Sequence, residues 1–171
     1  MSDFNEALAQ RLRMLEARTP TWKHARLTTF YPDAPPSQRK LEGGPLARGR
    51  YPILTAEQHL ADPVKYPFIV VAADLELEGK TLRPGFGPRI HFRAWPTWVF
   101  RIFDTGGAFY GKGKRIRDAG YEPFDIATNY SGTLRTSIAK QKHTMYRIDW
   151  LDILEYPKQL MTLRRPEPLV S

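Results

Sequence analysis

The sequence predicts an α+β protein with an N-terminal amphipathic helix, a mainly antiparallel sheet and long proline-rich loops. Apolar residues recur at helical spacing near the N-terminus, whereas from residue 68 onward they form short runs or alternate with polar residues, as in strands. The 15 prolines and 12 glycines favour many turns and few long helices.

We expect four segments along the chain. They are a helix over residues 1–20, a proline- and glycine-rich arm or linker over 31–52, a single α+β core domain over 53–156 and an extended C-terminal tail over 157–171. A chain of 171 residues can build one core without metal or disulfide support. It has no cysteine, which excludes disulfides, thiolate metal ligands and a cysteine nucleophile.

The N-terminal helix is predicted over residues 3–18, with Ser2 or Asp3 as its cap. Its apolar face is formed by Phe4, Leu8, Leu12 and Leu15. The simpler expectation is that this face packs on the protein's own core. The alternative is that the helix docks on a neighbouring subunit.

The arm over residues 31–52 contains five prolines and three glycines, which leave little room for a regular element. A loop this long inside a compact domain is uncommon and tends to be functional or disordered. We therefore weigh two interpretations, an arm that reaches a partner subunit and a linker.

Further elements follow from local patterns. A short helix is expected over 55–62 with Thr55 as cap, because Asp62-Pro63 ends it. A strand is expected over 68–78, in which Asp74, Glu76 and Glu78 share the solvent face, followed by a turn at Gly79-Lys80. Strands are also predicted over 89–95, 97–103 and 144–154, a loop over 112–121, and either a strand or a short helix over 133–141. Residues 121–130 are left open.

The most informative feature is the charge of residues 79–117. The whole chain has a net charge of +8, and this stretch contains nine Lys and Arg residues but a single acid, Asp104. Such a surface suits phosphates or acidic partner proteins. The residues expected to bind nucleic acid or a partner are Arg89, Arg93, Arg101, Lys112, Lys114, Arg115, Arg117, Trp95 and Trp98.

Two patterns are compatible with enzymatic chemistry. Residues 106–113 match the spacing of a phosphate-binding loop, but Gly113 stands where Ser or Thr must hold Mg²⁺. Asp74, Glu76 and Glu78 include paired carboxylates, which an alternating strand would place in solvent. The four histidines are scattered without metal-site spacing. We therefore expect no catalytic residue, no metal and no cofactor.

The expected function is that of a non-enzymatic structural or assembly component of a large complex, such as a phage head–tail or tail particle. Its 79–117 face would dock neighbouring subunits or line a nucleic-acid path. The alternatives are a sequence-nonspecific nucleic-acid-binding protein and a hydrolase or nucleotide-binding enzyme. Expected partners are protein subunits, including a homo-oligomer, and DNA or RNA through residues 79–117. No secretory or membrane-spanning run is apparent, so we expect a cytoplasmic or virion protein without membrane contact.

Overall fold

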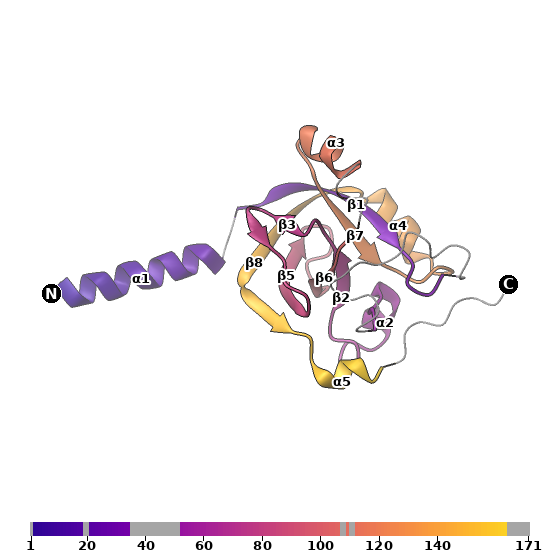
Figure 1. Cartoon of the computed structure of the whole chain (residues 1–171), viewed down its shortest axis with the longest axis horizontal. Coiled ribbons are helices and arrows are strands. Elements are labelled where there is room, and N and C mark those ends of the chain that lie inside the picture. The colour runs from indigo at the N-terminus through magenta and orange to yellow at the C-terminus, as the bar shows by residue number, and fades with distance from the viewer. Residues whose placement is uncertain (1, 19–20, 35–51, 107–108, 110–111, 164–171) are drawn as a thin grey trace.

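A closed barrel of six strands forms the body of the protein in a computed structural model, which describes residues 2–18, 21–34, 52–106, 109 and 112–163 (Figure 1). Around the barrel the strand order is β1-β7-β2-β6-β5-β8. The strands are β1 (Lys23–Phe30), β2 (Ile69–Ala72), β5 (Phe86–Phe92), β6 (Phe100–Asp104), β7 (Glu122–Ala127) and β8 (His143–Glu155).

The sheet is mixed, so the expectation of a mainly antiparallel sheet is correct only at the level of an α+β class. β1 pairs in parallel with β7, and β2 pairs in parallel with β6, while the other neighbours in the barrel are antiparallel. Local alternation gives no information on the direction of a distant partner, which is why the parallel pairs were not predicted. The first barrel strand, β1, also precedes the expected core domain of residues 53–156.

Five helices and a small hairpin surround the barrel in the described part of the chain. In Figure 1, α1 extends away from the barrel, and α3 lies on the side opposite to α2 and α5. The helices are α1 (Ser2–Arg18), α2 (Ala56–Ala61), α3 (Lys112–Asp118), α4 (Leu134–Lys140) and α5 (Lys158–Met161), and the hairpin consists of β3 (Glu76–Leu77) and β4 (Lys80–Thr81).

The barrel interior is filled by alternate residues of all six strands. Ala25 and Leu27 of β1 are buried, as are Ile90 of β5 and Ile148 of β8. A second apolar cluster covers the outside of β2 and β6, where Phe103 stacks on Phe68 at 5.2 Å and meets Tyr156 edge to face at 4.9 Å. Burial of this much apolar surface is the main source of stability.

Several predicted elements are confirmed. The terminal helix is present, and α2 begins at a capping box in which the Thr55 hydroxyl accepts from Gln58 N while the Gln58 side chain accepts from Thr55 N. β8 covers the predicted strand 144–154, with Tyr146 and Ile148 buried. The segment 133–141, which the sequence left open between strand and helix, contains α4.

Three predictions are wrong. The strand expected over 68–78 ends at Ala72, because the chain turns where the Asp74 side chain accepts from Glu76 N. The loop expected over 112–121 contains α3, since its Lys and Arg residues are good helix formers and Gly120, at φ +92°, follows the helix end. The tail expected to be extended over 157–171 begins with α5.

Two further expectations concern the arm and a membrane-spanning segment. Of the arm over 31–52, residues 35–51 lie outside the described residues. None of the described helices combines the length and the apolar character that a membrane crossing requires.

Candidate functional site

The outer side of β1 is strongly polar because the strand alternates. His24, Arg26 and Thr28 are exposed, whereas Ala25 and Leu27 point into the barrel. Arg26 is the register partner of His143 at the start of β8. The outward residues of β1 and β8 therefore lie on the same curved face of the barrel.

This face continues across β8 onto β5. His91 of β5 lies opposite Arg147 of β8. Trp22, just before β1, connects the two regions, because the Arg93 and Arg147 guanidinium groups lie 5.1 and 5.0 Å from its ring centre. We call this surface the basic sheet face, defined by Trp22, His24, Arg26, Arg89, His91, Arg93, His143 and Arg147.

Three adjoining hollows run over the outer side of β1, and together we call them the β1 groove. Their volumes are about 490, 540 and 320 Å³. The first two share Tyr121, and the last two share Arg26 and Thr28, so the hollows follow one another. The basic side chains that line the groove are Lys23, His24, Arg26, Arg115, Arg117, Lys142 and His143.

Three of the five Lys and Arg side chains in the groove have no carboxylate partner among the described residues. Lys23 pairs with Glu78, but none of the ion pairs among the described residues includes Arg26, Arg115 or Lys142. All three are exposed. They are therefore available to an anion that enters the groove.

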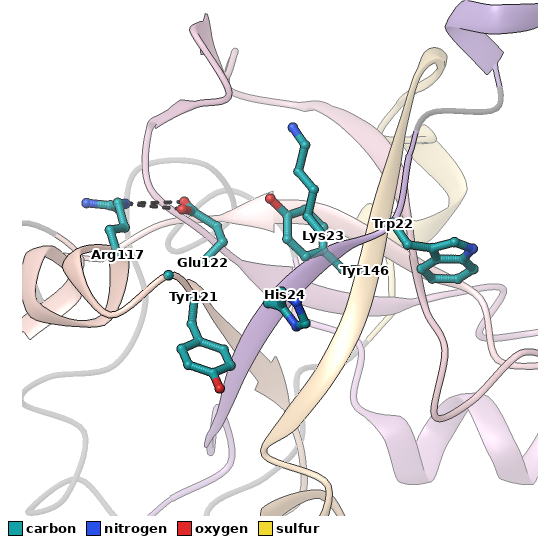
Figure 2. Close-up of a pocket in the computed structure, with 8 residues that line it drawn as sticks. Trp22, Lys23, His24, Arg117, Tyr121, Glu122 and Tyr146 are labelled. Atoms are coloured by element: carbon teal, nitrogen blue, oxygen red, sulfur yellow. Dashed lines mark hydrogen bonds and ion pairs between the residues drawn. The ribbon is translucent and has the colours of Figure 1, made fainter.

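Aromatic rings lie between these cations. Tyr121 stacks on His143 with centroids 4.7 Å apart and an interplanar angle of 25°, and His24 meets Tyr121 edge-on at 5.9 Å. Figure 2 shows Tyr121 pointing away from the ion pair between Arg117 and Glu122. A groove with cations and a half-exposed ring suits a ligand that has both negative charge and flat rings.

Two of the sequence-predicted binding residues have structural partners instead. Arg101 forms an ion pair with Asp152 at 2.8 Å and donates to the Gly87 and Asp152 carbonyl oxygens. Arg117 pairs with Asp74 and with Glu122, and it also donates to the Phe109 carbonyl oxygen. These guanidinium groups hold segments of the chain together.

The other predicted basic residues divide between two places. Arg89 and Arg93 belong to the basic sheet face, whereas Lys114 and Arg115 are exposed on α3, where Arg115 lines the β1 groove. Lys112 is the first residue of α3, and its side chain lies outside the described part of the structure. The stretch 79–117 is therefore not the surface on which the cations gather.

Trp95 and Trp98 serve the core rather than the basic sheet face. Their rings stack at 5.2 Å, and both are half-buried against the cluster inside the barrel. Phe92 and Phe100 lie beside Trp95 at 6.5 and 6.2 Å. Rings held in this way are typical of a packed barrel end.

The three carboxylates considered for catalysis do not form one site. Asp74 is buried and pairs with Arg117, while Glu76 accepts from the Thr81 hydroxyl at 2.6 Å. Glu78 accepts from Lys23, Tyr146 and Trp150 at 2.9–3.0 Å. Burial alone would raise the pKa of Glu78, but these three donors outweigh it and lower the pKa. These contacts anchor the hairpin to the barrel end.

Only part of the phosphate-loop pattern over residues 106–113 can be compared with the structure. Residues 107, 108, 110 and 111 lie outside the described part. Within the described residues no three His, Asp or Glu side chains group in a way that would hold a metal ion. Lys112, which the pattern would place at the phosphates, begins α3.

Asp125 and His91 are among the titrating groups whose pKa values are shifted beside the site. Burial raises the pKa of Asp125 to about 6, although its carboxylate accepts from the Thr28 hydroxyl at 2.6 Å. For His91, burial first and then the positive charges of Arg89 and Arg147 lower the pKa. Burial is the largest cause of both shifts, and nearby positive charge adds to it only at His91.

Sequence reasoning missed most of the groove, because it assigned no element to residues 21–30. The alternation of Ala25 and Leu27 with His24, Arg26 and Thr28 is a strand signal that was present in the sequence. Tyr121, Lys142, His143 and Arg147 lie outside the 79–117 stretch and join the site only through the fold. No protein-family model matches this chain, and comparison with curated proteins and with solved structures found no match.

Proposed function

We propose that this protein binds nucleic acid without catalysing a reaction, and that the β1 groove and the adjoining basic sheet face hold the ligand. The observation that carries the proposal is the convergence of Arg26, Arg115 and Lys142 on one hollowed surface, free of carboxylate partners among the described residues. Cations with no internal partner gain the most from a phosphate.

Each part of the groove has a role in this proposal. The three cations contact backbone phosphates, which gives affinity without sequence preference. The half-exposed Tyr121 ring, supported from behind by His143, offers a flat surface on which a base stacks. No hydrogen bonds to base edges are part of this arrangement, so we expect binding without sequence preference.

We propose no catalytic role for the candidate carboxylates, because their side chains already have partners. Asp74 neutralises Arg117, and Glu78 is held by three donors. A general base needs a free carboxylate within reach of a substrate proton.

The experiment is a fluorescence anisotropy titration with labelled single-stranded DNA and RNA over a range of salt concentrations. The test variant carries Arg26→Gln, Arg115→Gln and Lys142→Gln. The control carries Lys65→Gln, Arg83→Gln and Lys158→Gln, which remove the same charge from other exposed sites. We expect the test variant to lose affinity and its salt slope to fall by about 2, at roughly 0.7 per lost phosphate contact. Equal affinity of the two variants would refute the proposal.

A second candidate is the assembly component of a large particle, in the cytoplasm or a virion, with the basic sheet face docking an acidic neighbouring subunit. The exposed apolar side chains of α1 favour it, because a lone binding module has no need of them. An acidic polypeptide added to the anisotropy titration tests this candidate. Displacement of nucleic acid at equal charge concentration would support docking of a protein, and failure to displace would count against it.

A further inference from the structure

The terminal helix α1 presents an apolar stripe that the described part of the chain leaves exposed. The exposed fractions of Phe4, Leu8 and Leu12 are 73, 47 and 51%. α1 extends away from the barrel in Figure 1, with its closest approach to the body of the protein at β8. The expectation that this stripe packs on the protein's own core is therefore wrong for these three residues.

The spacing of Leu8, Leu12 and Leu15 fits pairing with another helix, and Phe4 falls at position g beside the contact. Read as a heptad, the sequence places Asn5 and Leu12 at position a, and Leu8 and Leu15 at position d. Apolar residues at these positions interlock between two helices, and a single Asn at position a fixes the register and favours two strands.

The charges beside the stripe indicate the partner and its direction. Arg11 occupies position g, and Glu16 occupies the following position e. In a parallel pair, position g of one helix faces the following position e of the other, so opposite charges meet twice in a symmetric dimer. In an antiparallel pair the side of the helix that carries Arg11 would face itself and bring like charges together.

We infer that α1 pairs in parallel with α1 of a second copy of this chain. This inference rests on the proposed assembly role, because it identifies a second copy of the chain as the partner that covers the apolar face of α1. It does not depend on nucleic-acid binding. The a and d positions span residues 5–15, about one and a half repeats, so we expect the dimer to dissociate on dilution.

Sedimentation equilibrium of the full chain over a concentration series tests the pairing. Leu8→Glu with Leu12→Glu should leave a monomer at every concentration. The control, Gln10→Glu with Ala17→Glu, adds the same charge at outer positions f and should dimerise like the native chain. A native chain that remains monomeric, or a dimer that survives the Leu8 and Leu12 substitutions, would overturn the inference.

Charge exchange and cross-linking test whether the two α1 helices pair in parallel. Arg11→Glu alone should weaken the dimer, and adding Glu16→Arg should restore it. The chain has no cysteine, so a single Asn5→Cys substitution should oxidise to a disulfide-linked dimer, whereas Gln10→Cys on the outer face should not. An antiparallel pair would show no rescue and no Asn5→Cys cross-link. Anisotropy on the monomeric variant tests nucleic-acid binding separately, so each proposal can fail alone.

Discussion

Arg89 of β5 lies directly opposite Arg101 of β6 in the barrel. Like charges at such a position repel, because the two side chains leave the sheet on the same face. Arg101 turns toward Asp152 and two carbonyl oxygens, whereas Arg89 has Asp149 as its register partner on the other edge of β5. Arg89 remains on the basic sheet face, with its Nε buried and without a partner in the described residues.

Replacement of Asp152 by alanine should therefore destabilise the barrel. Arg101 would keep its carbonyl partners but lose the carboxylate that offsets Arg89. We expect a loss of about 1–2 kcal/mol, because the Asp152 side chain is one third exposed and water screens part of the interaction. Chemical denaturation measures this value. An Asp152→Ala protein as stable as the native one would show that the ion pair contributes nothing net.

Substitution of Gly87 by alanine should be more costly than substitution of Gly79. An added Cβ at Gly87 would lie 2.5 Å from Cε2 of Phe103, a ring fixed by its stacking on Phe68. We expect the overpacked Gly87→Ala protein to lose about 1–3 kcal/mol. At Gly79 an added Cβ has no atom within 4 Å. The expected loss of stability is about 1 kcal/mol, because a side chain is disfavoured at its φ of +76°. Thermal unfolding of both variants would contradict this reasoning if Gly79→Ala were the less stable.

The raised pKa of Asp125 predicts that the Asp125→Asn substitution increases the stability of the fold in a pH-dependent way. Because the folded-state pKa of about 6 lies above the ordinary value of 3.8, this group stabilises the fold fully at low pH, and the contribution is lost as pH rises toward 6. Asparagine stays neutral and still accepts from Thr28. We therefore expect the variant to match the native protein near pH 4 and to exceed it at pH 7.5 by on the order of 1 kcal/mol. Thermal unfolding of the variant and the native protein at both pH values checks this prediction. A stability difference between the two proteins that is the same at both pH values would refute it.

The proposed stacking role of Tyr121 predicts a selective effect on single strands. Tyr121→Leu removes the ring while keeping an apolar side chain, and it should weaken single-stranded DNA binding by about 1–3 kcal/mol. Tyr121→Phe keeps the ring and should bind like the native protein. Duplex DNA, whose bases are already stacked, should be affected much less. Loss of affinity in both variants would instead point to the hydroxyl group.

The sequence reveals local elements but not the site that the fold assembles. α1, α2 and β8 were predicted because apolar spacing and the Thr55 cap lie within a few residues of one another. The ion pairs that remove Arg101 and Arg117 from the candidate surface involve Asp152 and Asp74, which are distant in sequence. Charge counted along the chain therefore located the cations only in part, and Arg26 and Lys142 joined Arg115 only when the barrel closed.

The parallel pairing of β1 with β7 sets a delay on folding during synthesis. Ala25 pairs with Glu122 on one edge and with Thr144 on the other, so β1 emerges from the ribosome roughly 100 residues before either neighbour. At 5–20 residues per second this corresponds to about 5–20 s during which both edges of β1 stay unpaired. Three of its first four residues, Lys23, His24 and Arg26, are basic and discourage edge-to-edge aggregation in that interval. Arg26, which we propose contacts a ligand in the folded protein, thus has a second role in the nascent chain.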